Sequence, residues 1–175
     1  MTDYLIRNAT VIDGSGDPRY VADVTIHDGK IRDIIRRPAS ASDAGGAVEV
    51  DAHGQVLSPG FIDMHAHSDL QVLADPPHMG RINQGITTEV TGQDGLSFAP
   101  VSDETLAELR VKIAGWNGNP PDFDFSWRSV SQYLDRLDQG VASNQCYLAP
   151  HGTIRALAAG WSDDPLTEAQ LDRMC

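Results

Sequence analysis

The sequence predicts an α/β protein built in two parts, and three observations support this. Up to about Leu57, short β-branched or alternating runs are separated by Gly, Asp and Asn, a pattern typical of strands and turns. After Pro59, predicted strands alternate with amphipathic helices, which indicates parallel pairing through helical crossovers. The 41% of hydrophobic residues are enough for a core. We therefore expect a β domain over residues 1–58 and strand–helix units over residues 59–175.

The β part is expected to contain six short strands. They are predicted over Tyr4–Ile6, Ala9–Ile12, Val21–Ile26, Lys30–Ile34, Val48–Val50 and Gln55–Leu57. Asp28-Gly29 predicts a tight hairpin turn between two of them, and residues 51–54 predict a second hairpin. The small polar residues 38–46 predict a loop. His27 and His53 lie in or beside turns, so we expect both to be solvated.

The second part begins with a strand that we expect to be buried, because it is apolar and follows the turn Ser58–Gly60. The predicted strands of this part are Phe61-Ile62, Ile86–Thr91 and Asn144–Ala149. Residues 71–83 predict a loop with a short helix, broken by Pro76-Pro77.

Two helices between these strands have clear signals. Ser102 can cap a helix whose first turn holds Asp103 and Glu104. The second helix is predicted over Ser129–Gln139, and Gly140 ends it. The residues expected to face inward are Leu106, Leu109, Ile113, Val130, Tyr133, Leu134 and Leu137.

A further helix is predicted near the end of the sequence. Thr167 and Gln170 form a capping box, and Leu166 can pack on Leu171. Because this helix begins shortly before Cys175, we expect three strand–helix units of a larger parallel (β/α)8 barrel. Such a barrel needs roughly 250 residues, so the chain is expected to be truncated.

The candidate site follows the first two strands of this second part. His65 and His67 are two positions apart, and side chains at i and i+2 of a strand share a face. Both imidazoles can therefore reach one metal ion. Asp94 follows the next strand, and barrel enzymes hold their catalytic groups at the C-terminal strand ends. The alternatives are two histidines that alternate by chance and, for Asp94, an Asp-Gly turn residue without a ligand role.

Other polar residues carry weaker predictions. His151 ends the third strand and can contact substrate or make a structural hydrogen bond. Arg155 can hold a substrate carboxylate or form a surface ion pair. Asp69 can support the histidines or cap a helix. We expect His78 to be solvated and Cys146 to lie in the core.

Composition restricts the partners. The net charge of −12 argues against nucleic acid or an anionic membrane. Cys146 and Cys175 provide no disulfide framework, which fits a reducing cytoplasm. The first residues do not match a signal peptide, and no apolar run reaches membrane-spanning length. We therefore expect a cytoplasmic protein.

Three segments resemble a known family. Gly60–Asp69 is similar to the first barrel strand of the amidohydrolase superfamily, with its His-x-His metal pair. Gln84–Pro100 most resembles the N-acyl-D-amino-acid deacylases, or D-aminoacylases, and Pro150–Arg155 is similar to a turn of that group. The resemblance covers essentially the whole chain. It implies a small β-sandwich followed by a TIM-type barrel.

One position departs from the family pattern. Where this chain has Asp94, the deacylase pattern usually has a cysteine that ligates the metal. A thiolate favours zinc, whereas a carboxylate is harder and also suits Mn²⁺ or Mg²⁺. The resemblance implies that His65, His67 and Asp94 bind a divalent metal, with zinc expected first.

The implied activity is metal-dependent hydrolysis of the linear amide bond of a small N-acyl amino acid, with water activated by the metal. Two further histidines and a catalytic aspartate are expected beyond Cys175, so we expect the 175-residue chain alone to be inactive. Two alternatives remain. One is a hydrolase of cyclic amides such as hydantoins or dihydropyrimidines. The other is a non-catalytic fragment that serves as an interaction module.

Overall fold

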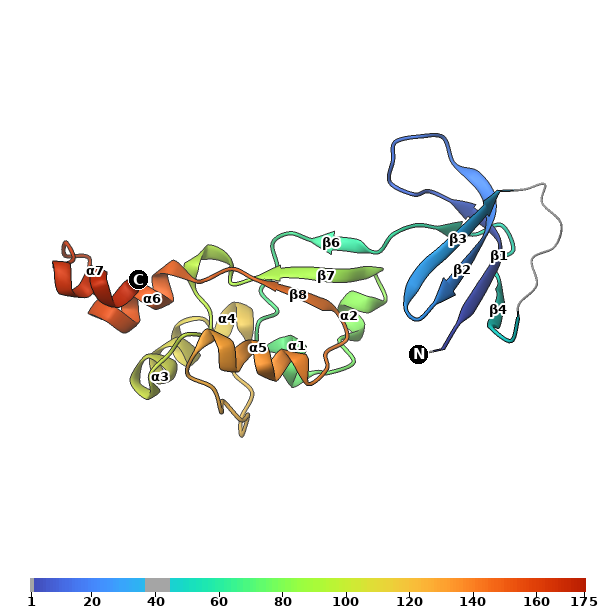
Figure 1. The fold of residues 1–175 in the computed structure, drawn as a ribbon. Coiled ribbons are helices and arrows are strands. Elements are labelled where there is room, and N and C mark those ends of the chain that lie inside the picture. The colour runs from blue at the N-terminus through green and yellow to red at the C-terminus, as the bar shows by residue number, and fades with distance from the viewer. Residues whose placement is uncertain (1, 37–44) are drawn as a thin grey trace. The chain divides into compact units, whose positions relative to one another are not determined.

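The computed structural model describes residues 2–36 and 45–175. The predicted loop over residues 38–46 lies, up to residue 44, outside the described residues. The chain forms two compact units, Met1–Pro59 and Gly60–Cys175 (Figure 1). Within the described ranges, none of the helices combines the length and apolar character of a membrane span.

The first unit is a single five-stranded sheet with the order β3-β2-β1-β4, and β5 also pairs with β1. Its strands are β1 (Tyr4–Val11), β2 (Tyr20–His27), β3 (Lys30–Arg36), β4 (Val48–Asp51) and β5 (Val56–Leu57). The predicted division of β1 into two strands is wrong. The strand continues through Asn8, where φ is 56°, and its register with β2 shifts between Ile6 and Ala9. The polar pair Arg7-Asn8 therefore marks an irregularity within one strand.

One of the two predicted hairpins is confirmed. Asp28 and Gly29 have φ values of 48° and 72°, as a tight turn between β2 and β3 requires. The second hairpin is wrong, because β4 and β5 both run parallel to β1. Between them, Ala52 donates to the Arg7 carbonyl and Gly54 to the Asn8 carbonyl. The segment follows the irregularity of β1 instead of turning back.

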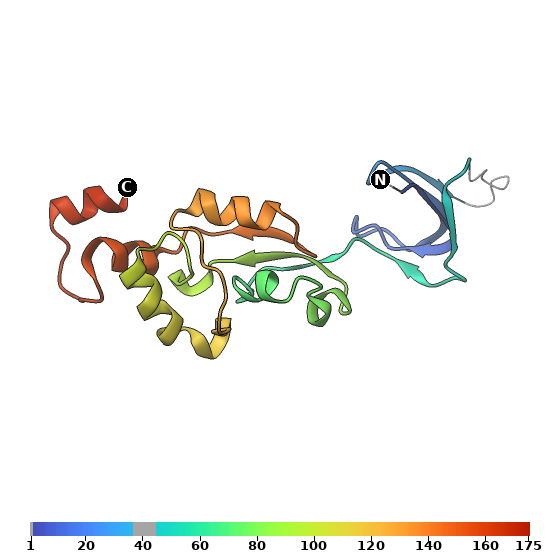
Figure 2. The same ribbon diagram turned by 90° about the horizontal axis from the view of Figure 1, so that it is seen from below.

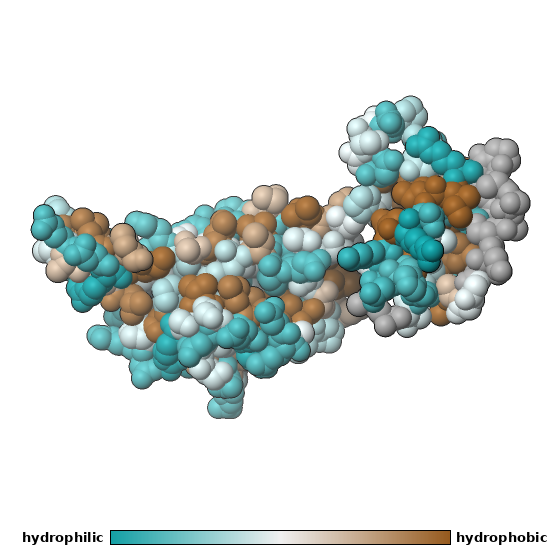
Figure 3. Space-filling view, in the orientation of Figure 1, coloured by the Kyte–Doolittle hydropathy of each residue, from teal (hydrophilic) through white to brown (hydrophobic). Residues whose placement is uncertain are grey.

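Apolar side chains remain on the surface of the first unit. Figure 3 shows hydrophobic surface on this unit, over the region of β2 and β3. The exposed apolar side chains of these two strands are Val21, Ile31 and Ile34. The small core of this unit contains Ala9, Val11, Ala22 and Val24, all of which are buried. His27 and His53 are exposed at their turns, as expected.

The second unit contains a three-stranded parallel sheet with the order β6-β7-β8, which confirms the predicted parallel pairing. The strands are β6 (Phe61–Asp63), β7 (Ile86–Thr91) and β8 (Asn144–Tyr147). The helices are α1 (Gln71–Ala74), α2 (Met79–Ile82), α3 (Asp103–Lys112), α4 (Ala114–Asn117), α5 (Val130–Asp138), α6 (His151–Ala159) and α7 (Glu168–Met174). Figures 1 and 2 show α1, α2 and α5 on one face of this sheet.

Helices begin at the predicted caps Ser102 and Thr167, and at Ser129, where the second helix was predicted to start. Ser102 accepts a hydrogen bond from the Thr105 nitrogen, and Ser129 and Thr167 form capping boxes at α5 and α7. The polar caps satisfy backbone N–H groups that the first helical turn leaves without partners. Pro76-Pro77 separates α1 from α2, so the predicted single short helix is two.

The core of this unit lies between the sheet and these helices. It contains Leu70, Phe98, Leu109, Ile113, Trp127, Tyr133 and Leu137, all buried. Trp127 donates to the Phe98 carbonyl at 2.8 Å, so its polar atom is satisfied inside the core.

Three segments or residues that were expected to be buried are exposed. Leu134 is 39% exposed in the middle of α5, and Cys146 is exposed on β8. Phe61 and Ile62 are 63% and 59% exposed. Within the described part of the chain, the helices cover only one face of the sheet, so apolar residues on the other face remain accessible.

His78 is buried, contrary to the expectation of a solvated loop residue. It is 4% exposed, and its Nε2 lies 2.9 Å from Glu89 Oε2. Ser68, Ser143 and Gln145 also donate to the Glu89 carboxylate, and Arg81 Nε lies 3.4 Å from its Oε1. Glu89 is fully buried on β7, and a buried carboxylate requires such partners. The contact with Glu89, which is distant in the sequence, therefore orients the His78 side chain toward the interior.

The Glu89 cluster leads to a prediction about pH-dependent stability. Burial opposes ionisation of Glu89, but hydrogen bonds from Ser68, Ser143 and Gln145 outweigh burial and lower its pKa. The carboxylate therefore stabilises the fold fully above the unfolded pKa, and this contribution is lost as the pH falls through the lower folded pKa. We expect Glu89→Gln to lower the free energy of unfolding by about 1–3 kcal/mol at neutral pH.

Urea unfolding followed by circular dichroism measures this effect. The difference from wild type should shrink as the pH falls below the ordinary pKa of glutamate, and a difference that stays constant would contradict the account. Glu104→Gln, an exposed residue of α3, is the matched control and should change stability less.

Candidate metal centre

His65 and His67 follow β6 and are not part of the strand. The strand ends at Asp63, so the predicted reason for their common direction, two alternate positions on one strand, is wrong. The backbone still follows β7, because the Ala66 nitrogen donates to the Val90 carbonyl at 3.0 Å. Ala66 is fully buried, as expected for a residue that faces away from the histidines.

Asp94 lies in a short 3-10 turn, Gln93–Gly95, directly after β7. Its backbone is left-handed, with φ of 55°, a conformation that Asp tolerates better than most residues. Gly92 precedes the turn with φ of 76°, and a Cβ there would lie 2.1 Å from the Leu148 carbonyl oxygen. Glycine at position 92 therefore allows the Asp94 loop to pack closely against the end of β8.

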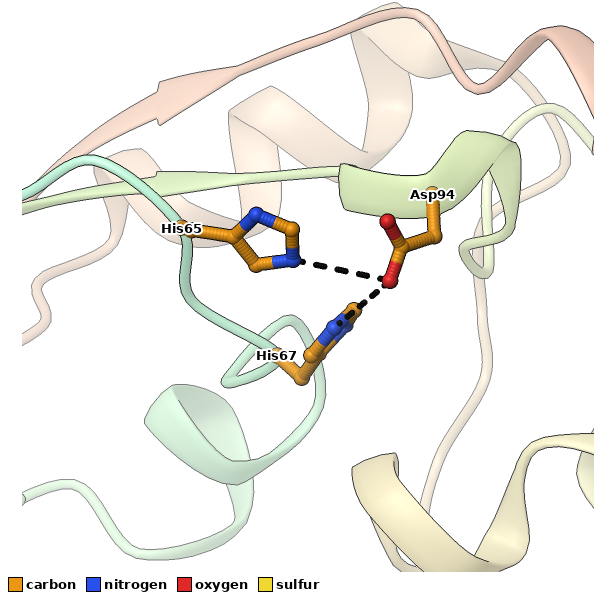
Figure 4. Close-up of side chains that lie close together, drawn as sticks. All are labelled: His65, His67 and Asp94. Atoms are coloured by element: carbon orange, nitrogen blue, oxygen red, sulfur yellow. Dashed lines mark ion pairs between the residues drawn. The ribbon is translucent and has the colours of Figure 1, made fainter.

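The three side chains converge on one point (Figure 4). His67 Nε2 lies 3.1 Å and His65 Nε2 lies 3.5 Å from the same oxygen, Asp94 Oδ2. One ligand atom from each residue lies within 4.8 Å of the others. Ligands bound at 2.0–2.2 Å to a tetrahedral zinc are roughly 3.4 Å apart. The two histidine-to-carboxylate separations match that spacing, and the donor set of two imidazoles and a carboxylate suits zinc and other divalent metals.

The site is open on one side and supported on another. The exposed fractions of the His65 and Asp94 side chains are 58% and 48%, which leaves room for a water molecule and a substrate. His67 is more enclosed, and its ring centroid lies 4.6 Å from that of Trp116. Among the residues described, no hydrogen-bond partner faces the buried Nδ1 of His67. The Nε2 atom of the same ring is directed at the shared point, 3.1 Å from Asp94 Oδ2.

Buried polar residues connect the two loops that carry these side chains. Asp69 is fully buried and accepts hydrogen bonds from Ser97 and from the Gly92 nitrogen. Burial raises the pKa of the Asp69 carboxyl, and these hydrogen bonds oppose the increase. Gln93 donates to the Met64 carbonyl at 2.8 Å, which joins the loops a second time.

Trp116 and Asn117 were not predicted to belong to this site. Both lie in α4, in a stretch whose Gly, Asn and Pro content indicates a loop. Their contacts with the His67 segment depend on tertiary packing, and no local pattern in the sequence indicates them. An aromatic residue beside a stretch rich in Gly, Asn and Pro is the only signal available.

The two remaining predicted residues lie outside the three-residue cluster. His151 is the first residue of α6 and is exposed, and a Cβ on Gly95 would lie 4.0 Å from the His151 nitrogen. His151 therefore begins its helix beside the Asp94 loop. Arg155 Nη2 donates to the carbonyls of Ser162 and Asp164, so that nitrogen is already engaged.

Comparison with known proteins gives consistent matches. A family profile described as the amidohydrolase family matches residues 48–174. The N-acyl-D-aspartate deacylase of Alcaligenes xylosoxydans xylosoxydans is 33% identical over 169 residues, which cover 96% of this chain and 32% of that protein. The chain thus spans about a third of the length of this curated relative.

Solved structures show the same α/β fold. The crystal structure of D-aminoacylase matches with a TM-score of 0.78 and 30% identity, over 99% of this chain and 35% of that one. The N-acyl-D-glutamate deacylase of Bordetella bronchiseptica, crystallised with zinc and a phosphonate mimic of the tetrahedral intermediate, matches with a TM-score of 0.73. It is 30% identical, over 99% of this chain and 34% of that one.

The geometry predicts which substitutions change metal binding. Loss of His65, His67 or Asp94 by substitution with alanine should weaken zinc binding by more than the roughly 10–100-fold cost of losing a supporting residue. Competition with a chromogenic zinc chelator measures the dissociation constant. His53→Ala, an exposed turn histidine, is the control and should bind zinc as wild type does. Equal affinities for the His67→Ala and His53→Ala variants would contradict the site.

Proposed function

The chain belongs to the amidohydrolase family, and we propose that it contributes the metal ligands of a hydrolase that cleaves the linear amide bond of N-acyl-D-amino acids. One observation carries this proposal: two imidazole nitrogens approach the same carboxylate oxygen at 3.1 and 3.5 Å. Similarity to an N-acyl-D-aspartate deacylase over nearly the whole chain favours a linear amide over a cyclic one.

The proposed ligands of a divalent cation are His65, His67 and Asp94, and zinc is the first candidate. The zinc in the related deacylase from Bordetella bronchiseptica supports this choice. When bound, such a cation makes water more acidic and polarises an amide carbonyl. Manganese or magnesium is the alternative because Asp94 offers a hard oxygen donor.

The residues of this chain have separate proposed roles around that cation. His65 and Asp94 are half-exposed and leave one side of the site free for an amide group. Trp116 packs against His67, which restricts the imidazole and offers an apolar surface beside it. His151 is a proposed substrate contact because its helix starts beside the Asp94 loop. Arg155 is the second proposed substrate contact. It would have to donate to a substrate carboxylate from nitrogens other than Nη2, because Nη2 already donates to two carbonyls.

We also propose an architecture for this function. Residues 59–175 would provide strand–helix units of a TIM-type barrel, and residues 1–58 the single sheet described above as one layer of a separate β-sandwich-like domain. The parallel order β6-β7-β8, with helices on one face, supports the barrel. The exposed apolar side chains of Phe61, Ile62 and Met64 are those that further barrel strands and their side chains would cover.

An activity assay tests the proposal directly. The complete product of the gene that encodes this chain, loaded with zinc, should release free D-amino acid from N-acetyl-D-amino acids. A chelator should abolish the release, zinc should restore it, and His67→Ala should remove it. Hydantoin or dihydropyrimidine hydrolysis without cleavage of any linear amide would contradict the proposal.

Metal preference tests the role of Asp94. Asp94→Cys should raise the preference for zinc over manganese by roughly tenfold or more, because a thiolate is softer than a carboxylate. The left-handed backbone at position 94 costs the new residue roughly 1 kcal/mol, which affects both metals equally. Asp94→Asn keeps the turn and should weaken both metals. An unchanged zinc-to-manganese ratio in the cysteine variant would show that residue 94 does not bind the metal.

A further inference from the structure

Asp69 holds together the two loops that carry the proposed metal ligands. It is fully buried and lies two positions after His67. Its Oδ1 accepts a hydrogen bond from the Gly92 nitrogen at 2.8 Å and another from Ser97 Oγ at 2.6 Å. Gly92 lies two positions before Asp94. One buried oxygen therefore fixes the histidine segment against the segment that carries the carboxylate.

The second oxygen of Asp69 contacts a third segment. The Asn117 amide, oriented with its nitrogen toward two acceptors, donates to Asp69 Oδ2 at 3.2 Å and to the His67 carbonyl at 2.9 Å. Asn117 is 2% exposed, and its neighbour Trp116 packs against the His67 ring. Helix α4 thus contacts both the backbone and the side chain of His67. Asp69 in turn links this helix to the Asp94 loop.

We propose that Asp69, together with Ser97 and Asn117, is a positioning residue that sets the distance between Asp94 and the two histidines. This inference rests on the proposed metal centre. Both Asp69 oxygens are already occupied by donors from the protein, so Asp69 acts through Gly92 and His67. A metal site requires its ligands to be held within roughly 0.5 Å of their productive positions.

A purely structural role for Asp69 is the competing interpretation, and Glu89 provides the comparison. Glu89 is equally buried in the same unit, and one of its donors, Ser68, follows His67. Its donors His78, Ser143 and Gln145 lie outside the ligand-bearing loops, and none of these four donors lies in the Asp94 loop. The two buried carboxylates therefore hold different segments of the chain in place. Of these two carboxylates, only Asp69 accepts from both the Asp94 loop and α4, the helix that contacts the His67 backbone.

The test replaces each carboxylate with its amide and measures cobalt binding. Asp69→Asn keeps the shape and one acceptor oxygen, but its amide nitrogen faces the donating amide of Asn117. We expect cobalt affinity to fall roughly 10–100-fold, and the d–d absorption spectrum of bound cobalt to change, because that spectrum reports ligand geometry. Glu89→Gln should lose stability in urea but retain the wild-type cobalt affinity and spectrum.

The outcomes separate this inference from the proposed function. If Asp94→Ala loses cobalt while Asp69→Asn binds it with wild-type affinity and spectrum, the positioning role is overturned and the metal centre stands. A wild-type chain that binds no cobalt overturns both. If Asp69→Asn does not fold by circular dichroism, Ser97→Ala removes one donor and should cause a smaller loss with the same spectral change. A wild-type affinity and spectrum in Ser97→Ala would then overturn the role.

Discussion

Convergence of His65 Nε2 and His67 Nε2 on Asp94 Oδ2 is the interaction on which the account depends. A carboxylate oxygen has two lone pairs and can accept hydrogen bonds from two imidazoles, and the separations of 3.1 and 3.5 Å also fit a shared cation. The spacing is that of ligands around one cation. A metal at that point would give the openness of the site, the packing of Trp116 and the buried Asp69 cluster a common function.

The fold provides this convergence through parallel pairing. Because β6 and β7 run in the same direction, the segments that follow them leave the same edge of the sheet. Close backbone packing then restricts the loops: Gly92 approaches the Leu148 carbonyl, and Ala66 continues the hydrogen bonding to Val90. Hydrogen bonds to Asp69 and from Gln93 complete the restraint. The exposed part of the site therefore packs on a buried layer of hydrogen-bonded polar side chains. Asp69 belongs to this layer, and its hydrogen bonds allow an acidic residue to be fully buried close to the site.

Local patterns were sufficient to predict much of the fold. Caps at Ser102, Ser129 and Thr167 are visible as short-range signals, and so is the turn at Asp28-Gly29. Features set by distant partners were not predictable. The pairing of β4 and β5 with β1 depends on an irregularity at Asn8, and the burial of His78 depends on Glu89. In the same way, His65, His67 and Asp94 could be selected from the sequence, whereas Trp116 and Asn117 could not, because only tertiary packing brings α4 to His67.

Anomalous X-ray diffraction at the zinc edge, from crystals of the zinc-loaded protein, would locate the cation. An anomalous peak is expected within bonding distance, roughly 2.0–2.2 Å, of His65 Nε2, His67 Nε2 and an Asp94 carboxylate oxygen. A peak bound only to other surface carboxylates, or density showing His65 and His67 directed away from Asp94, would contradict this expectation.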